Sequence, residues 1–480
     1  MKRLLSAILC LCMLLVLTAC GSGSTANTTP TGTTQGTTAA AGAKGFRVGY
    51  ARQDITPSQI VDLWGYAQPA GQRMSKDGVL DYIYLTCVAV TDESDNTVLF
   101  YAADLGSMEV SVTADIKTMV NKKLDIPMEN IFLNATHTHS APSCYDLKTV
   151  LVDAAVKIGK EALEDQKPAQ MYFGTANTSG INFVRHYWGL DGKSITDNHG
   201  DTSATEFKGH TTEIDQEMRV LQFKREGGKD VILVNWQSHP HMTGGPQKYS
   251  ISADIVGMMR MNMEQDLDCL FAYYQGGAGN INPTSRIKSE MANPDMNYKV
   301  TGKMLAETAA KALENMTQLE AGPITVKSET FTCQSNQEDL DKLDAAQKVV
   351  DYYLAGHTAT EAKPYAEELG LASYYHANNV LSRAKREPNF KIEISVVTIG
   401  DLAWAIMPGE FFDTTTRYIR ENSPYTYNFT AAYTNGYHGY FPSQEAWDYG
   451  CYEADIAPGN PGETEAIADR LLEMLKEIHG

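Results

Sequence analysis

Four short segments of the sequence place histidine, glutamate or tyrosine directly after an apolar run. In the first, residues 134–142, His137 and His139 are two positions apart. Residues i and i+2 of an extended segment point to the same side, so these two imidazoles are expected to project together. The spacing suits a metal ligand beside a proton-transferring group. Two unrelated polar histidines at a strand end are the alternative.

The other three segments each add a further group. His239 follows the apolar run that ends at Trp236, and Glu410 follows the Pro408–Gly409 dipeptide between apolar neighbours. A carboxylate in such surroundings is costly to bury unless it is paired or coordinated. The fourth segment, residues 436–440, is rich in tyrosine. Taken alone, each of these segments also fits a structural histidine, an exposed turn acid or aromatic packing.

Together the four segments supply two imidazoles, a carboxylate and a phenol. This donor set suits zinc with one position left open for water. α/β proteins build their sites where strands run into loops, and each segment follows a predicted strand. The sequence therefore predicts a central zinc site at strand ends.

The elements that position this site are predicted from the spacing of apolar residues. Strands are expected over residues 97–103, 130–135, 171–174, 219–223, 231–236, 270–274, 391–399, 402–407 and 427–434. Helices are expected over 111–123, 150–164, 253–265, 298–316 and 463–478. The alternation indicates an α/β fold in which helices flank mixed β-sheets. Residues 336–386, rich in Ala, Glu, Lys, Leu and Tyr, are predicted to be a helical insertion formed by two helices.

The N-terminus has the pattern of a bacterial lipoprotein. Lys2 and Arg3 precede an apolar run over residues 4–19, which is shorter than the roughly 20 residues of a membrane-spanning helix. The run ends in a lipobox: Leu17, Thr18, Ala19, Cys20. Residues 1–19 are predicted to be a signal peptide and 20–45 a lipidated Cys20 with a flexible linker. The protein is then expected to be extracytoplasmic and anchored to the cell membrane by lipid, with a plain transmembrane anchor as the alternative.

Composition and charge exclude several classes of protein. The formal net charge of −19 gives the chain no electrostatic reason to bind nucleic acid. No nucleotide-binding glycine motif is present. Five cysteines remain after Cys20 without any CxxC pair, which disfavours a thiolate metal cluster. Most are expected to be small buried residues, and one disulfide would be compatible with an exported protein.

Several motifs are similar to those of the neutral, non-lysosomal ceramidases. The resemblance extends over roughly residues 46–478 and rests on these stretches: Asp54-Ile55-Thr56-Pro57, Trp64-Gly65-Tyr66-Ala67, Ala103-Asp104-Leu105-Gly106, Ala135-Thr136-His137-Thr138-His139-Ser140, Asn235-Trp236 with His239, and Pro408-Gly409-Glu410-Phe411. The chain thus resembles the catalytic domain of that family, expected over residues 46–480.

The resemblance implies roles for individual residues. It makes zinc (Zn2+) ligands of His137, His239, Glu410 and Tyr440. It places His139 beside them as an acid–base group and Tyr452, twelve residues after Tyr440, in the active site. Arg185 matches a family arginine near Asn182, although with different spacing. The serine of the family's Gly-Asp-Val-Ser-Pro motif is replaced by Asn282.

The resulting expectation is an enzyme, a zinc-dependent amidohydrolase of sphingolipid metabolism. Metal-activated water would cleave the amide of ceramide (N-acylsphingosine) or of a related N-acyl lipid. His139 would protonate the leaving amine, and Tyr452 or Arg185 would stabilise the oxyanion. Asn282 leaves two alternatives open: the same zinc chemistry on another small amide or ester, or a catalytically dead lipoprotein that binds a ligand at the surface.

Overall fold

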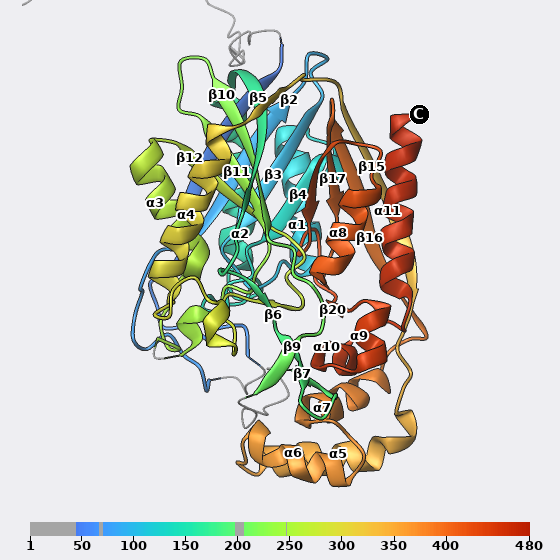
Figure 1. Ribbon diagram of the computed structural model, residues 1–480. Coiled ribbons are helices and arrows are strands. Elements are labelled where there is room, and N and C mark those ends of the chain that lie inside the picture. The colour runs from blue at the N-terminus through green and yellow to red at the C-terminus, as the bar shows by residue number, and fades with distance from the viewer. Residues whose placement is uncertain (1–44, 67–70, 197–205, 246) are drawn as a thin grey trace, which may run out of the picture. The chain divides into compact units, whose positions relative to one another are not determined.

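The computed structural model describes residues 45–66, 71–196, 206–245 and 247–480 (Figure 1). The predicted signal peptide, Cys20 and the linker up to residue 44 lie outside the described residues. The expected catalytic domain is therefore described almost from its first residue.

The larger of two extended sheets is mixed. Its strands are β1 (Arg47–Asp54), β2 (Tyr84–Thr91), β3 (Thr97–Ala103), β4 (Ile131–Ala135), β5 (Lys167–Asn177), β10 (Glu217–Arg225), β11 (Val231–Trp236), β12 (Leu270–Gln275) and β14 (Thr317–Leu319). They are ordered β12-β11-β10-β5-β1-β2-β3-β4, and β14 also pairs with β5. The pairs β3–β4 and β11–β12 are parallel, whereas the other pairs are antiparallel.

A smaller sheet packs against one face of the larger sheet. It contains β15 (Ile324–Gln334), β16 (Asn389–Ile399), β17 (Leu402–Ile406) and β19 (Tyr427–Ala431) in that order. Phe100 of β3 and Trp404 of β17 stack in the core between the sheets, with their ring centroids 4.6 Å apart. Leu99 and Tyr101, which alternate with Phe100, belong instead to the core on the opposite face. Both faces of β3 are therefore buried, which explains its unbroken apolar sequence.

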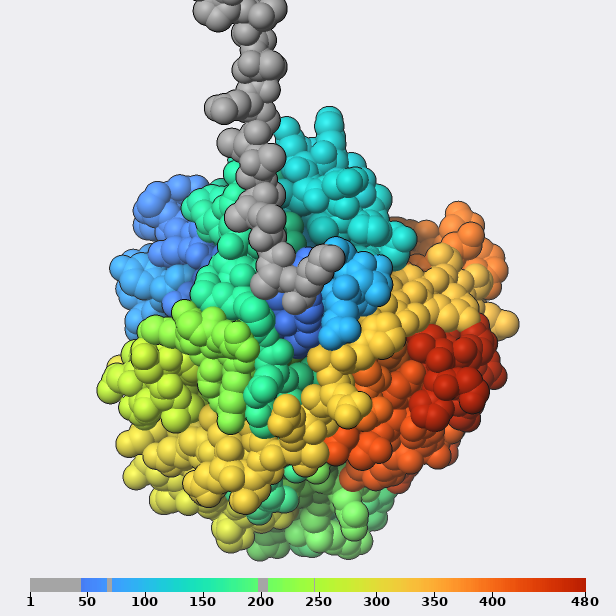
Figure 2. All heavy atoms as spheres, turned by 90° about the horizontal axis from the view of Figure 1, so that it is seen from above, coloured from blue at the N-terminus to red at the C-terminus, as the bar shows by residue number. Residues whose placement is uncertain are grey.

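Helices cover the outer faces of the two sheets. They are α1 (Val110–Leu124), α2 (Lys148–Glu164), α3 (Asp254–Leu267), α4 (Tyr298–Glu314), α8 (Asp413–Asn422) and α11 (Glu463–His479). α3 and α4 pack on the β10–β12 part of the larger sheet, and α11 packs on β15 and β16 of the smaller one (Figure 1). Seen from above, the red C-terminal end of α11 lies at one side of the molecule, next to yellow and orange segments (Figure 2). The layers run helix, sheet, sheet, helix.

The predicted α/β class with mixed sheets is confirmed. Each predicted strand and helix is found with its ends shifted by a few residues, except that the strand predicted over 171–174 is part of the longer β5. β5 is long because it pairs with β1, β10 and β14. The sequence patterns did not indicate β1, β2 and β15.

The region 336–386 contains three helices, so the prediction of two was wrong. They are α5 (Leu343–Leu354), α6 (Ala359–Glu368) and α7 (Tyr374–Arg383). Two glycines with positive φ, Gly356 (108°) and Gly370 (74°), separate them, where only the first break was expected. Below α9 (Gln444–Tyr449) and α10 (Tyr452–Ile456), these helices form one end of the molecule (Figure 1). Their apolar faces form a core of their own.

Two further properties concern the described part of the chain. None of its helices is long and apolar enough to cross a membrane. Its cysteines are all buried and unpaired, which confirms them as small core residues and leaves no disulfide among the described residues: Cys87, Cys144, Cys269, Cys333, Cys451.

Candidate metal centre

His137 lies just beyond the end of β4, at a turn into the site. Its backbone N–H donates to the carbonyl oxygen of Leu105 (2.9 Å), and its φ is 70°, in the left-handed region. The segment is therefore not extended at His137, whereas the sequence predicts an extended segment, and the i, i+2 spacing of a strand is not what brings His137 and His139 together. The two imidazoles nevertheless meet, with their Nε2 atoms 3.4 Å apart, because the turn at His137 redirects the chain.

Backbone carbonyls orient the imidazoles of His137 and His239. Nδ1 of His137 lies 2.7 Å from the carbonyl oxygen of Gly106, and Nδ1 of His239 lies 3.1 Å from that of Ile281. Because a carbonyl only accepts hydrogen bonds, each Nδ1 must carry the proton. In the neutral form of such an imidazole Nε2 carries the lone pair, as it does in a metal-ligating histidine.

Glu410 and Tyr440 are held side by side by a short parallel sheet. The strands β18 (Glu410–Phe411) and β20 (Tyr440–Phe441) pair with these two residues in register. Oε2 of Glu410 lies 3.2 Å from Nε2 of His137 and 3.2 Å from Nε2 of His239. Three of the four predicted ligands thus converge through their donor atoms, and the fourth is their neighbour in the sheet.

Two tyrosines that the sequence analysis did not select support the carboxylate. The hydroxyl of Tyr433 donates to Oε2 of Glu410 at 3.3 Å, and the hydroxyl of Tyr437 donates to Oε1. Tyr433 follows β19 with a positive φ of 55°, and Tyr437 lies three residues before Tyr440. The only signal in the sequence was that the stretch containing them is rich in tyrosine, and aromatic packing explained this richness equally well.

The charges in the cluster match those of a metal site. Burial opposes ionisation of Glu410, yet His137 and His239 hold the pKa of its carboxyl well below its usual range. Burial, followed by the nearby Arg185 charge, lowers the pKa of His239 to about 3, so this imidazole is neutral. Burial and the Glu410 carboxylate raise the pKa of the Tyr440 phenol well above its usual range. A phenolate at Tyr440 therefore requires a cation beside it.

These residues fit a divalent metal ion. Two imidazoles, one ionised carboxylate and one phenol are nitrogen and oxygen donors of the kind that zinc accepts. His137, His139 and His239 also form a buried group whose ring nitrogens lie within 4.8 Å of one another. His137, His239, Glu410 and Tyr440 could hold the ion.

His139 differs from the two histidines that carbonyls orient. Its Nδ1 is buried without a hydrogen-bond partner among the described residues, so the outer contact usual for a ligand histidine is missing. The imidazole lines a cleft of about 710 Å³ that is also lined by Glu410, Tyr440 and Tyr452. Burial and the imidazoles of His137 and His239 lower the pKa of His139 well below its usual value. A neutral imidazole that faces the cleft is placed for proton transfer.

Arg185 reaches the centre of the cluster. Its Nη1 lies 3.4 Å from Nε2 of His239, and its Nη2 donates to the Tyr440 hydroxyl at 3.2 Å. Nε donates to Oε1 of Glu453 at 2.7 Å, and Oε2 of Glu453 lies 2.7 Å from Nε2 of His186. Burial raises the pKa of Glu453, but Arg185 and then His186 outweigh it and hold that pKa below its usual range. Arg185, whose match to the family was the weakest in the sequence, is thus held firmly by Glu453.

The two remaining predicted residues lie at different places. Tyr452 begins α10, with its ring 5.9 Å from that of Tyr440, and it faces the same cleft. Asn282, in β13 (Ile281–Asn282), has its Oδ1 3.0 Å from Nε2 of His241, and it is not among the residues that line this cleft. The structure therefore brings Tyr452 to the cleft and pairs Asn282 with His241.

The ring of Trp64 packs against the histidines on one side of the centre. The Trp64 ring lies edge-on to His137 and His139, with both centroid distances 5.3 Å. A Cβ at Gly106 would come within 1.9 Å of Trp64, and one at Gly65 within 2.6 Å of His139. The glycines of the Trp-Gly and Leu-Gly motifs thus permit close contact between the loops. Arg73, which the sequence gave no reason to select, joins them by donating to the carbonyl oxygens of Trp64 (2.8 Å) and His139 (2.5 Å).

Another group of metal-ligand types is explained by hydrogen bonding. His186, Cys451 and Glu453 are buried and close together. Nδ1 of His186 lies 2.8 Å from the Tyr449 hydroxyl, and Glu453 is paired with both His186 and Arg185. Both nitrogens of His186 and the carboxylate are already engaged, so this group supports Arg185.

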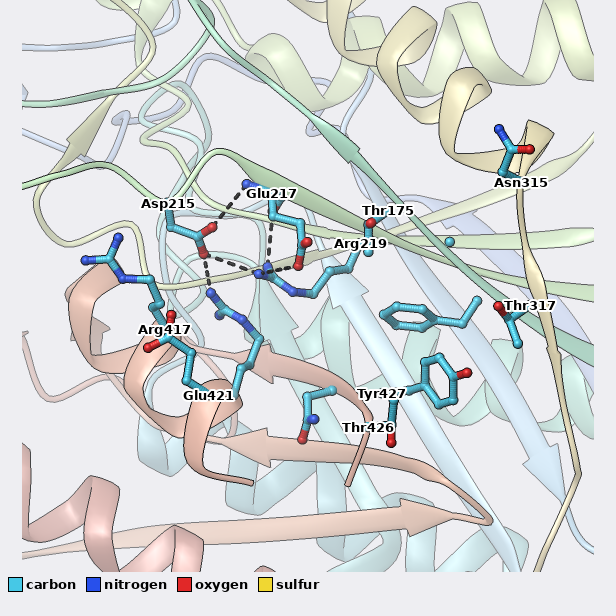
Figure 3. Close-up of a pocket in the computed structure, with 14 residues that line it drawn as sticks. Thr175, Asp215, Glu217, Arg219, Asn315, Thr317, Arg417, Glu421, Thr426 and Tyr427 are labelled. Atoms are coloured by element: carbon cyan, nitrogen blue, oxygen red, sulfur yellow. Dashed lines mark hydrogen bonds and ion pairs between the residues drawn. The ribbon is translucent and has the colours of Figure 1, made fainter. Parts of the chain in front are cut away.

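A separate pocket of about 550 Å³ lies beside β10 and α8. In it Arg219 points toward Asp215 and Glu217, at 3.4 Å and 3.0 Å, and Arg420 of α8 also pairs with Asp215 (Figure 3). Burial raises the pKa of Asp215, but Arg420 and then Arg219 outweigh it and lower that pKa. These charges satisfy one another and link the larger sheet to α8.

The chain is similar to known proteins in sequence and in fold. Residues 46–387 match the family model described as neutral/alkaline non-lysosomal ceramidase, N-terminal. The match contains both histidine segments, whereas Glu410, Tyr440 and Tyr452 lie beyond it. The neutral ceramidase of Pseudomonas aeruginosa is 22% identical over 336 residues, which are 64% of this chain and 45% of that protein. The chain thus spans less than half the length of this relative.

Two solved structures share the fold. The crystal structure of neutral ceramidase from Pseudomonas aeruginosa aligns with a TM-score of 0.67 and 17% identity, covering 91% of this chain and 75% of that one. A structure described as ceramidase complexed with C2 aligns with the same score and identity and is covered to 76%. At these identities the likeness shows the fold.

Proposed function

The chain belongs to the neutral/alkaline non-lysosomal ceramidase family, and we propose that it is a zinc-dependent hydrolase of an amide bond in ceramide or a related N-acyl lipid. One observation carries this proposal. Nε2 of His137 and Nε2 of His239 both lie 3.2 Å from one Glu410 oxygen, while Tyr440 pairs in register with Glu410. In a chain of this family, such a set fits a catalytic metal.

Zinc held by His137, His239, Glu410 and Tyr440 would activate a water molecule and polarise the amide carbonyl. The protein's own side chains supply the proton transfers. His139 is neutral at rest, so it can accept the proton that the attacking water loses. It then delivers this proton to the amine nitrogen as the C–N bond breaks. The products are a carboxylic acid and an amine.

Arg185 and Tyr452 are placed to stabilise charge on the carbonyl oxygen. Although burial lowers it, Glu453 raises the pKa of Arg185 well above its usual range, so the guanidinium stays charged. A charge fixed by an ion pair needs no rearrangement during the reaction, which makes such groups effective at stabilising an oxyanion. Tyr452 faces the same cleft and adds a phenol donor.

The substrate is a separate question from the chemistry. Asn282 replaces the serine of the family motif, and its side chain is bonded to His241. This favours a second candidate, the same hydrolysis on another small amide or an ester. A lipid-anchored protein with this fold that only binds its ligand is the third, and turnover distinguishes it from the other two.

The test is hydrolysis of a fluorescent short-chain ceramide by the zinc-loaded protein, alongside matched non-sphingoid amides and esters. Release of fatty acid from ceramide supports the proposal as stated. Hydrolysis of other amides alone supports the second candidate. No turnover on any of them, in protein with zinc bound, would contradict both enzymatic functions.

A further inference from the structure

The cleft in front of the metal centre includes residues of the α7 segment. Asn379 on α7 and Arg386 just after it line the cleft together with His139, Glu410 and Tyr452. α7 is fixed there by two hydrogen bonds to the segment after Tyr452. Nδ2 of Asn379 donates to the carbonyl oxygen of Ile456 (2.8 Å), and Nη2 of Arg383 donates to that of Asp455 (2.6 Å).

Arg386 carries a positive charge that no described carboxylate neutralises. Its Nη1 is buried without a hydrogen-bond partner among the described residues. Burial lowers the pKa of Arg386, and no nearby acid opposes this effect. For Arg383, by contrast, Glu338 counters the pKa-lowering effect of burial. An arginine nevertheless remains protonated in proteins, so the charge persists.

The acids of the cleft have other partners. Glu109 lines it as well, but its Oε1 accepts a hydrogen bond from the Ser107 hydroxyl at 3.0 Å, and burial raises its pKa toward the neutral form. Glu410 is engaged by His137 and His239. Neither carboxylate forms an ion pair with Arg386 in the described part of the chain. Arg386 is half-buried, and a charge that is partly withdrawn from water without a counter-charge is costly, so a ligand anion beside it recovers part of that cost.

A second unused polar atom comes from the same segment. Oδ1 of Asn379 is buried without a partner among the described residues, while Nδ2 of the same amide is bonded to Ile456. Both residues also line the cleft, so the segment places a charged side chain, Arg386, and a polar amide, Asn379, beside a bound ligand. A ligand with an oxyanion and a nearby polar group matches both.

We propose that Arg386 selects amide substrates that carry an anionic group near the scissile bond, such as the carboxylate of an N-acyl amino acid. This inference rests on the proposed amide hydrolysis and narrows its substrate class. A neutral headgroup would leave the guanidinium without a counter-charge, whereas a carboxylate would form a charge-assisted hydrogen bond with it. Arg386 is a binding residue in this account and takes no part in the chemical step.

The experiment compares two amides that differ in one group, N-dodecanoylglycine and N-dodecanoylethanolamine. The zinc-loaded parent is expected to hydrolyse the anionic amide with the higher kcat/KM. In R386M the ratio of the two kcat/KM values should fall about 10- to 100-fold, mainly through KM, since one charge-assisted hydrogen bond is lost. R386K keeps the charge and should restore part of the ratio. The adjacent exposed Lys385 provides the matched control K385M, which should leave the ratio as in the parent.

The experiment distinguishes a failure of the proposed amide hydrolysis from a failure of the selectivity assigned to Arg386. Equal turnover of both amides by the parent, or an unchanged ratio in R386M, would overturn the role of Arg386 and leave the amidase standing. If neither amide is hydrolysed, the ceramide assay decides the proposed function, and calorimetric binding of both compounds to the same samples tests the selectivity by itself. The parent should then bind the anionic amide more tightly, with the difference lost in R386M. Equal binding would overturn the inference.

Discussion

At the scale of single residues, the tautomers of two histidines decide what the centre can bind. The carbonyl oxygens of Gly106 and Ile281 each fix a proton on Nδ1, which directs the Nε2 lone pairs of His137 and His239 toward Glu410. His139, without such an outer contact, stays available for protons. Histidine side chains thus serve two purposes in this site, and the contact of the second ring nitrogen decides which one.

Loss of a ligand should therefore remove the metal. We expect H239A to bind zinc at least about 100-fold more weakly than the parent, because even outer contacts of ligand histidines are worth 10- to 100-fold. Zinc content after dialysis against a weak chelator measures this. H479A, at an exposed histidine near the end of α11, is the control and should keep parental zinc. Parental affinity in H239A would show that the ligand assignment is wrong.

Which residues could be foreseen depends on how local their signals are. His137, His239 and Glu410 each follow an apolar strand within a few positions, and that neighbourhood is visible in the sequence. The support of Arg185 by Glu453 joins residues 268 positions apart, and that of Glu410 by Tyr433 joins two strand ends. Contacts of this kind arise from the topology and leave no local pattern.

At the scale of elements, several strands that the sequence indicated are buried on both faces, as β11 and β17 are, but β2 is buried in the same way and was missed. β1 was missed because Gly49 interrupts its apolar run; a Cβ there would lie 1.8 Å from the carbonyl oxygen of Ala162 on α2, so only glycine fits. β15 was missed because it is an edge strand with polar residues over much of its length. Both failures have a physical origin in what the strand packs against.

The loop that carries Trp64 should control the position of His139. In G65A the new Cβ would approach His139 at 2.6 Å, at a backbone φ of 115°. We expect amide turnover to fall about 100-fold with zinc content unchanged, since a misplacement of 1 Å can have that effect. Gly71 also has a positive φ (83°) but open space around its Cβ, so G71A reproduces the backbone strain without the contact. Equal activity losses in the two variants would contradict the positioning role.

Asp215 should link β10 to α8 in a pH-dependent way. D215N leaves Arg219 and Arg420 without their shared carboxylate, and we expect the free energy of unfolding at pH 7 to fall by about 3 kcal/mol. The two arginines outweigh burial and lower the pKa of Asp215 in the fold. Its contribution is thus present above the unfolded value of about 3.9 and lost as the pH falls below it.

Denaturant unfolding of the parent and D215N at pH 7 and below pH 4 checks this prediction. The difference in unfolding free energy between them should shrink at the lower pH. D295N, at an exposed aspartate, should stay within about 0.5 kcal/mol of the parent. A difference that persists unchanged in acid would show that the charge of Asp215 is not its cause.

At the scale of the whole molecule, the location of the protein is proposed from its N-terminus. The acidic chain, with a formal net charge of −19, has no electrostatic attraction to anionic lipid, and no described helix could span a membrane. We propose that the lipobox ending at Cys20 supplies the attachment, which would place the catalytic cleft where lipid amides are concentrated.

Replacing Cys20 should release the protein from the membrane. We expect C20S, expressed in a bacterial host, to move from the detergent-rich to the aqueous phase on detergent partitioning, because no acyl chain is added. C12S, inside the predicted signal peptide, is the control and should partition as the parent. Retention of C20S in the detergent phase would mean that something other than a lipid on Cys20 holds the protein.

The central claim is that hydrolysis of an amide depends on one metal ion in this cleft. The most direct measurement titrates zinc into chelator-treated protein while following release of fatty acid from an amide that the zinc-loaded protein turns over. We expect no turnover at the start, a rise in proportion to added zinc and a plateau at one equivalent per chain. Full turnover before any zinc is added would contradict the central claim.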